Sequence, residues 1–138
     1  MNKALYSSKS NNWETPVELF KELDKEFSFT LDPCCTSANA KCKKYYTEKE
    51  NGLLQSWNGE TVFCNPPYGT EIKQWVKKCY YESRKNSAKV VLLIPARTDT
   101  EYFHSFIYHK AQIRFIKGRL RFSNSKNSAP FPSMIVIF

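Results

Sequence analysis

Thr61-Val62-Phe63-Cys64-Asn65-Pro66-Pro67-Tyr68 is the stretch of sequence that decides the fold. Its first four residues are mostly apolar and favour β-structure, which predicts a short buried strand. The Asn-Pro-Pro-Tyr turn then lies at the carboxyl end of that strand. Open α/β sheets bind their ligands at this edge, so the stretch predicts both the fold class and the place of the site.

The side chains and carbonyls of this turn suit the activation of a planar, conjugated amine. The Asn65 side-chain oxygen and the Pro66 carbonyl can each accept one amine hydrogen, which favours a pyramidal nitrogen with a free lone pair. Pro66 and Pro67 restrict φ to about −65° and supply no competing N–H. Tyr68 can stack on a base that has been swung out of a duplex. A plain Pro-Pro turn with Tyr68 as packing is the alternative, but the combination favours a catalytic site.

The charge of the chain indicates a polyanionic partner, most simply nucleic acid. The formal net charge of the 138 residues is +8, although lysines also favour solubility. Aromatic residues are interleaved with the basic ones, as expected where phosphates and bases are contacted together. The basic residues form two groups, the first being Lys73, Lys77, Lys78, Arg84, Lys85 and Lys89, and the second Arg114, Lys117, Arg119, Arg121 and Lys126.

The cysteines and the hydropathy pattern indicate a soluble protein of a reducing compartment. The five cysteines lack paired C-x-x-C spacing, and neither His104 nor His109 stands at metal-ligand spacing from them. We therefore expect reduced thiols and no metal site. No apolar run approaches the length of a membrane span, and the N-terminus lacks a signal-peptide core, so a cytoplasmic location is expected.

Helical and strand patterns alternate along the chain. Residues 1–12 are polar and predict a flexible N-terminal arm, and residues 13–138 predict a single domain. A first helix is expected to start at Thr15, as its cap, with Pro16 in the first turn and Glu18 completing a capping box. Alternating apolar residues then predict a strand that ends at Asp32.

The second half of the chain repeats this alternation. Apolar residues recur at helical spacing over residues 70–85, and residues 90–94 form a continuous apolar run typical of a central strand. A capping-box pattern at residues 98–101 predicts a further helix, and strands are expected at residues 112–116 and 134–138. The pattern as a whole predicts an α/β fold with a mostly parallel sheet, helices on both faces and an antiparallel C-terminal strand.

Four motifs, in this order, resemble the phage-type DNA N6-adenine methyltransferase family. They are Trp13-Glu14-Thr15-Pro16, Leu31-Asp32-Pro33-Cys34-Cys35, Asn65-Pro66-Pro67-Tyr68 and Gly118-Arg119-Leu120-Arg121-Phe122. The resemblance runs from Trp13 to Phe138. It implies a compact, Rossmann-like methyltransferase fold, S-adenosylmethionine as the cofactor, double-stranded DNA as the partner, and the cytoplasm of a bacterium or phage-infected host cell as the location.

The resemblance also implies roles for individual residues. It makes residues 65–68 the catalytic motif, and it implies that six residues bind the cofactor: Trp13, Thr15, Pro16, Asp32, Pro33 and Cys34. A helix N-terminus near Thr15 offers backbone N–H groups to a carboxylate, and Asp32 can accept from amino or ribose hydroxyl groups. The alternatives are a plain helix cap and a carboxylate that caps its own turn.

Four basic residues are candidates for contact with nucleic acid. Arg97 follows the strand at residues 90–94, so it lies at the same edge as Asn65 and could bind a phosphate or the cofactor carboxylate. Lys73 follows the Asn-Pro-Pro-Tyr turn, and Arg119 and Arg121 belong to the last motif. Solvated surface charges are the alternative for each of them.

The sequence thus predicts a metal-free, S-adenosylmethionine-dependent methyltransferase for the N6 amine of DNA adenine. One alternative is another planar amine: an RNA base, cytosine N4 or a protein glutamine. A second alternative is a catalytically inactive nucleic-acid-binding module, because the presumed cofactor loop, residues 35–38, contains no glycine. The oligomeric state stays open, with a homodimer as one option.

Overall fold

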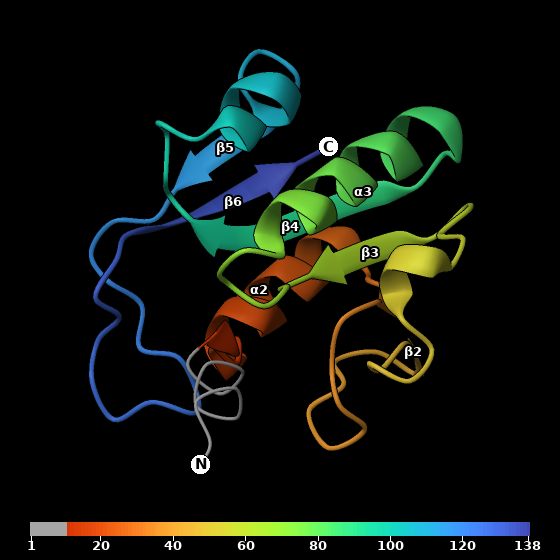
Figure 1. Cartoon of the computed structure of the whole chain (residues 1–138). Coiled ribbons are helices and arrows are strands. Elements are labelled where there is room, and N and C mark those ends of the chain that lie inside the picture. Colours follow the sequence, from red (N-terminus) through yellow and green to blue (C-terminus); the bar gives the residue numbers. More distant parts are fainter. Residues whose placement is uncertain (1–10) are drawn as a thin grey trace.

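The computed structural model describes residues 11–138. Helical and strand segments alternate along the chain as the sequence predicts (Figure 1). Their bounds are α2 (Val17–Phe27), β1 (Leu31–Asp32), β2 (Lys44–Tyr45), η1 (Gly52–Leu54), β3 (Thr61–Cys64), α3 (Ile72–Lys85), β4 (Lys89–Pro95), η2 (Phe103–Ile107), β5 (Gln112–Phe115) and β6 (Ser133–Ile137).

The six strands form one sheet in the order β2-β1-β3-β4-β6-β5. The strands β2, β1, β3 and β4 are parallel neighbours. The last strand, β6, is antiparallel to both β4 and β5, so β5 runs in the same direction as β4. The predictions of a mixed α/β fold with a mostly parallel sheet and an antiparallel C-terminal strand are confirmed.

Helices cover both faces of the sheet, as alternate side chains of β3 show. The ring of Phe63 lies 5.2 Å from that of Phe20 on α2. Its neighbour Cys64 points to the other face, where its thiol contacts that of Cys79 on α3. Because successive side chains of a strand point to opposite faces, α2 and α3 lie on opposite sides of the sheet (Figure 1).

The start of α2 differs from the prediction. Pro16, not Thr15, is the N-cap residue, and no side chain caps the helix. The Thr15 hydroxyl accepts a hydrogen bond from Asn65 Nδ2 at 2.9 Å, so it is turned away from the first turn of α2. A contact with a distant part of the chain therefore replaces the local capping box.

The strand predicted to end at Asp32 is shorter than its alternating pattern indicates. Phe27 is still helical, and Ser28 ends α2 in the left-handed conformation with φ of 56°. The Phe29 N–H donates to the Asp24 side chain at 2.9 Å instead of joining the sheet. The Thr30 N–H donates to the Thr61 carbonyl of β3 at 2.7 Å, and the strand itself is limited to Leu31–Asp32, because the end of α2 takes up the residues to Phe29.

The helix predicted from residues 98–101 begins at Glu101 and continues as the short π-helical turn η2, Phe103–Ile107. The Thr100 hydroxyl, not that of Thr98, accepts from the Phe103 N–H at 3.3 Å. The five cysteines are free thiols. Over residues 11–138, no helix has the length and apolarity needed to cross a bilayer.

Candidate active site at the carboxyl edge of the sheet

Three segments that are distant in sequence meet at the carboxyl end of β3. The Tyr68 N–H donates to the Asn11 carbonyl at 2.7 Å, which joins the turn to the segment before α2. The Ser123 N–H donates to the Glu14 carbonyl at 2.8 Å, which joins that segment to the loop between β5 and β6. The site is therefore assembled from residues 11–15, 65–68 and 120–131.

The carboxamide of Asn65 is held in one orientation by three hydrogen bonds. Its Nδ2 donates to the Trp13 carbonyl at 2.6 Å and to Thr15 Oγ1 at 2.9 Å, which uses both amide hydrogens. Its Oδ1 accepts from the Tyr68 hydroxyl at 2.7 Å. An amide oxygen has two lone pairs, so Oδ1 keeps the capacity to accept one further hydrogen bond.

Tyr68 is 4% exposed, and its hydroxyl also lies 3.2 Å from the Leu93 carbonyl. Burial raises the pKa of this phenol well above its ordinary value, so it stays a neutral donor. Its ring makes T-shaped, edge-to-face contacts with the rings of Phe122 and Phe131, whose centroids lie 6.2 and 5.7 Å away. Tyr68 thus holds Asn65 through its hydroxyl and is itself held by aromatic packing.

Pro66 contributes a second acceptor beside Asn65. It is buried, and within residues 11–138 no N–H or O–H donates to its carbonyl oxygen. Pro67, which follows it, has no N–H of its own. The turn therefore offers two oxygens that can still accept: Asn65 Oδ1 and the Pro66 carbonyl.

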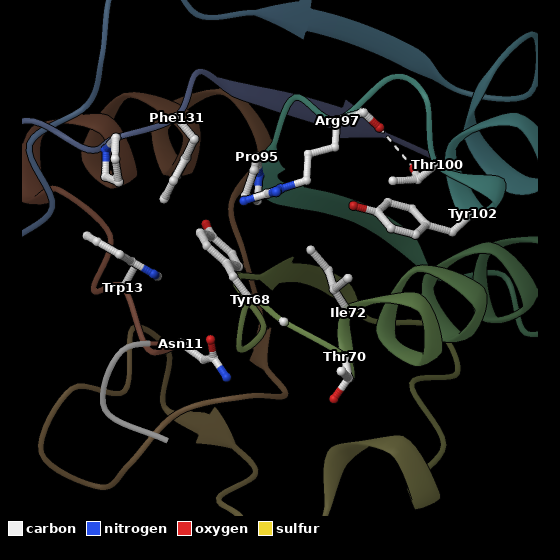
Figure 2. Close-up of a pocket in the computed structure, with 12 residues that line it drawn as sticks. Asn11, Trp13, Tyr68, Thr70, Ile72, Pro95, Arg97, Thr100, Tyr102 and Phe131 are labelled. Atoms are coloured by element: carbon white, nitrogen blue, oxygen red, sulfur yellow. Dashed lines mark hydrogen bonds between the residues drawn. The ribbon is translucent and has the colours of Figure 1, made fainter. Parts of the chain in front are cut away.

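Of the four turn residues, Tyr68 lines a cavity of about 510 Å³, whereas Asn65, Pro66 and Pro67 do not line it. The size is typical of small-molecule sites, which span roughly 300–1,000 Å³. We call this cavity the aromatic pocket, because its wall contains four aromatic side chains and a single charged one. Figure 2 shows these side chains arranged around the pocket. They are Trp13, Tyr68, Tyr102 and Phe131, with Arg97 as the charged residue.

Asp32 lies at the end of β1 and holds its own loop. It is 3% exposed; its Oδ1 accepts from the Cys34 N–H at 3.3 Å and its Oδ2 from the Lys41 N–H at 3.0 Å. Burial raises its pKa to about 6. These contacts match the alternative considered above, a carboxylate that caps its own turn. A carboxylate has about four acceptor sites, so further capacity remains.

The loop after β1 packs closely on the loop before β3. A side chain at Gly52 would collide with the Pro33 carbonyl, which explains a glycine at this position. Burial raises the pKa of the Cys34 thiol, and the nearby Asp32 carboxylate acts in the same direction. Cys34 is therefore a neutral packing residue of the loop, not a thiolate.

The structure separates the residues predicted to bind cofactor and DNA into groups. Trp13 and Arg97 line the aromatic pocket, whereas Thr15 and Pro16 precede α2. Lys73, in the first turn of α3, is exposed, as are Arg119 and Arg121 on the segment after β5, and none of the three lines the pocket.

Sequence reasoning missed several residues of the site. Asn11 receives the Tyr68 N–H, and Tyr102 and Phe131 line the pocket. Phe131 comes from an irregular loop without a periodic pattern, and the prolines on either side of it indicate a turn but not a binding residue. The capping pattern before Tyr102 indicates a helix start but likewise no ligand contact.

Comparisons with known proteins agree with these observations. The model of the family described as DNA N-6-adenine-methyltransferase (Dam) matches residues 3–138. The Escherichia coli (strain K12) protein described as "Putative methyltransferase YfdM" is 35% identical over an alignment of 65 residues, which covers 42% of this chain and 71% of that protein. Since the family model covers nearly the whole chain, this protein belongs to the DNA N-6-adenine-methyltransferase (Dam) family, as its four motifs predicted.

Proposed function

We propose that this protein transfers a methyl group from S-adenosylmethionine to the N6 amine of adenine in DNA. The observation that carries the proposal is the fixed carboxamide of Asn65. Both of its amide hydrogens are used by Trp13 and Thr15, so its oxygen is the atom left to meet a substrate. An extruded adenine in the aromatic pocket would stack on aromatic rings and direct its amine toward Asn65 and Pro66.

The two acceptors of the turn would act on the amine during the reaction. Asn65 Oδ1 and the Pro66 carbonyl each accept one N6 hydrogen, which draws the lone pair out of conjugation as the transition state forms. Most of the acceleration would come from positioning. The methylated amine is acidic enough to lose its proton to water or a neighbouring group, so the chain needs no strong general base.

The cofactor is proposed to lie between the start of α2 and the loop after β1. No side chain of residues 11–138 caps α2, so its first N–H groups are free of side-chain acceptors from this part of the chain and suit the carboxylate of methionine. Asp32, Pro33 and Cys34 would form the opposite wall, with the spare acceptors of Asp32 facing an amino or hydroxyl group. When bound, the cofactor supplies the methyl group on a sulfonium sulfur.

The strand order and directions support a Rossmann-like methyltransferase fold, with this cofactor site at the carboxyl ends of β1 and β3. Double-stranded DNA is the proposed partner. The net charge of +8 favours it, and Lys73, Arg119 and Arg121 are exposed cations available to its phosphates. A homodimer stays a prediction.

The direct test is incubation of the protein with S-adenosylmethionine carrying a labelled methyl group and with plasmid DNA. Nucleoside analysis of the product should find the label in N6-methyladenine. Label in cytosine N4, in added RNA or in protein glutamine would instead identify one of the other planar amines. If no acceptor is labelled and saturating cofactor does not raise the Tm, the protein is a binding module without catalysis.

A further inference from the structure

The hydroxyl of Tyr102 is a buried polar group without a hydrogen-bond partner among the described residues. The residue is 8% exposed, and no atom of residues 11–138 forms a hydrogen bond with its hydroxyl. The nearby Thr100 hydroxyl donates to the Arg97 carbonyl at 2.9 Å and accepts from the Phe103 N–H at 3.3 Å, and it forms no hydrogen bond of normal geometry with the Tyr102 hydroxyl. A buried hydroxyl left unpaired costs about 1–3 kcal/mol, so this one is expected to meet a ligand.

The position of this hydroxyl points to the aromatic pocket. Tyr102 lines the pocket, and Figure 2 shows its hydroxyl directed toward the space that it shares with Tyr68 and Arg97. Two other buried side-chain polar atoms of the described chain lack partners: Trp75 Nε1 and Ser133 Oγ. Neither of these residues lines the pocket, so Tyr102 is distinguished from them by its access to a ligand.

Arg97 adds a positive charge to the same wall. The ion pairs within residues 11–138 are Lys44–Glu60, Lys78–Glu82 and Arg114–Glu26. Arg97 takes part in none of them, and it is the one charged side chain of the pocket wall. A guanidinium free of carboxylates beside aromatic rings suits a ligand that combines a planar ring system with a phosphate.

We propose that Tyr102 and Arg97 bind a single extruded nucleotide, with the Tyr102 hydroxyl donating to a ring nitrogen of the base and the Arg97 guanidinium binding a phosphate of the same nucleotide. This inference rests on the proposed function. Asn65 and Pro66 take the amine hydrogens of adenine, and its remaining polar ring atoms are acceptors that require a donor. Tyr102 supplies that donor.

The first test replaces Tyr102 by phenylalanine. Tyr102→Phe should lower kcat/KM for DNA about three- to tenfold, as expected for the loss of one hydrogen bond, while the Tm stays the same or rises because an unpaired hydroxyl is removed. Ser133→Ala removes an equally buried, unpaired hydroxyl outside the pocket and should leave kcat/KM unchanged. Wild-type kcat/KM in Tyr102→Phe would overturn the inference.

Deaza substrates show whether the hydroxyl meets a ring nitrogen. Duplexes containing 1-deaza-, 3-deaza- or 7-deazaadenine at the methylated position each lack one ring acceptor. The wild type should lose the same three- to tenfold on one of them, and Tyr102→Phe should lose nothing further on that duplex. If the wild type and Tyr102→Phe lose equal additional factors in kcat/KM on each of the three duplexes, the Tyr102 hydroxyl does not donate to a ring nitrogen of the base. A wild type inactive on ordinary DNA would instead refute the proposed function.

The phosphate contact is tested by DNA binding, independently of methyl transfer. Arg97→Ala should reduce the slope of log K against log salt concentration by about 1. Lys110 is a control cation outside the two basic groups, and its Nζ donates to the Ser105 carbonyl at 2.6 Å. Lys110→Ala should leave the slope unchanged. An unchanged slope in Arg97→Ala, or equal changes in both variants, would overturn the phosphate contact.

Discussion

Two buried polar regions of this molecule differ in how completely they are paired. The first, the Glu82 cluster, consists of Glu82, Trp57, Lys78 and Asn86. The Glu82 carboxylate, 6% exposed, accepts from the Trp57 N–H at 2.6 Å, from Lys78 Nζ at 3.0 Å and from Asn86 Nδ2 at 2.9 Å. The second region is the aromatic pocket, where the Tyr102 hydroxyl has no partner in the described chain.

This difference separates polar groups that hold the fold from polar groups available to a ligand. The Glu82 cluster ties α3 to the segment before β3 and has hydrogen bonds on both carboxylate oxygens. Asp32 combines both properties, because its two oxygens accept backbone N–H groups of its loop and still have acceptor capacity left. The turn at Asn65 and the wall at Tyr102 instead keep acceptor or donor capacity, and this is the property that substrate binding requires.

The largest effect is expected for Asn65→Ala in the second region. Removal of the carboxamide eliminates one of the two acceptors for the amine, and loss of one such preorganised group typically lowers kcat by about 10²–10³-fold. Binding of cofactor and DNA should be largely retained. A radiolabelled methyl-transfer assay measures the loss, and near-normal turnover would contradict the two-acceptor mechanism.

Glu82→Ala tests the first region and should act on stability. It leaves the Trp57 N–H and the Lys78 ammonium without their partner, which costs on the order of 3 kcal/mol of unfolding free energy. Urea denaturation measures this loss, while kcat of the folded variant at low temperature should change little. The exposed pair of Glu26 and Arg114 is the control, and Glu26→Ala should lower stability much less. A large fall in kcat in Glu82→Ala would contradict the assignment of a purely stabilising role to the Glu82 cluster.

Thr15→Val should lower kcat about tenfold, because the Asn65 carboxamide loses one of the acceptors that orient it. Thr15→Ser keeps a hydroxyl and should restore most of the rate. Steady-state kinetics separate this positioning role from the cofactor contact that the sequence predicts for Thr15. A variant with a raised KM for S-adenosylmethionine and an unchanged kcat would favour the cofactor contact.

The smallest effect concerns the pH dependence of stability. Burial raises the pKa of Asp32 from 3.8 to about 6, so the folded protein holds this proton more tightly than the unfolded chain. The stability that Asp32 contributes is therefore greatest below its pKa in the unfolded chain, and it is lost as the pH rises through about 6. The Tm of the wild type minus that of Asp32→Asn should fall between about pH 4 and pH 7.

Glu60 provides a control of opposite sign. The hydrogen bond with Lys44 lowers the pKa of Glu60 in the folded protein. The stability that Glu60 contributes is therefore present above its pKa in the unfolded chain, and it is lost as the pH falls through its pKa in the folded protein. The Tm of the wild type minus that of Glu60→Gln should therefore rise with pH. If the Tm difference between the wild type and Asp32→Asn also rises with pH, burial does not destabilise the charged Asp32 carboxylate.

Local patterns in the sequence predicted the main elements of the fold. The continuous apolar run at residues 90–94 became the buried strand β4, and the helical stripe of residues 72–79 became the core-facing side of α3. The errors occurred where the expected pattern competed with another contact, a distant one at Thr15 and a local one at Phe29. Thr15 has the pattern of a helix cap but bonds to Asn65, and Phe29 has the alternation of a strand but follows the end of α2.

The sequence by itself determined which elements form and that Asn65 to Tyr68 end a buried strand, because burial patterns and proline restrictions act between neighbours in the chain. Only the tertiary structure decided the orientation of the Asn65 carboxamide, since the two acceptors of its amide hydrogens lie 50 and 52 residues away. It also decided that Tyr102 and Phe131 share a pocket with Tyr68. Loops without a repeating pattern bring these groups together, and their contacts depend on packing across the sheet edge.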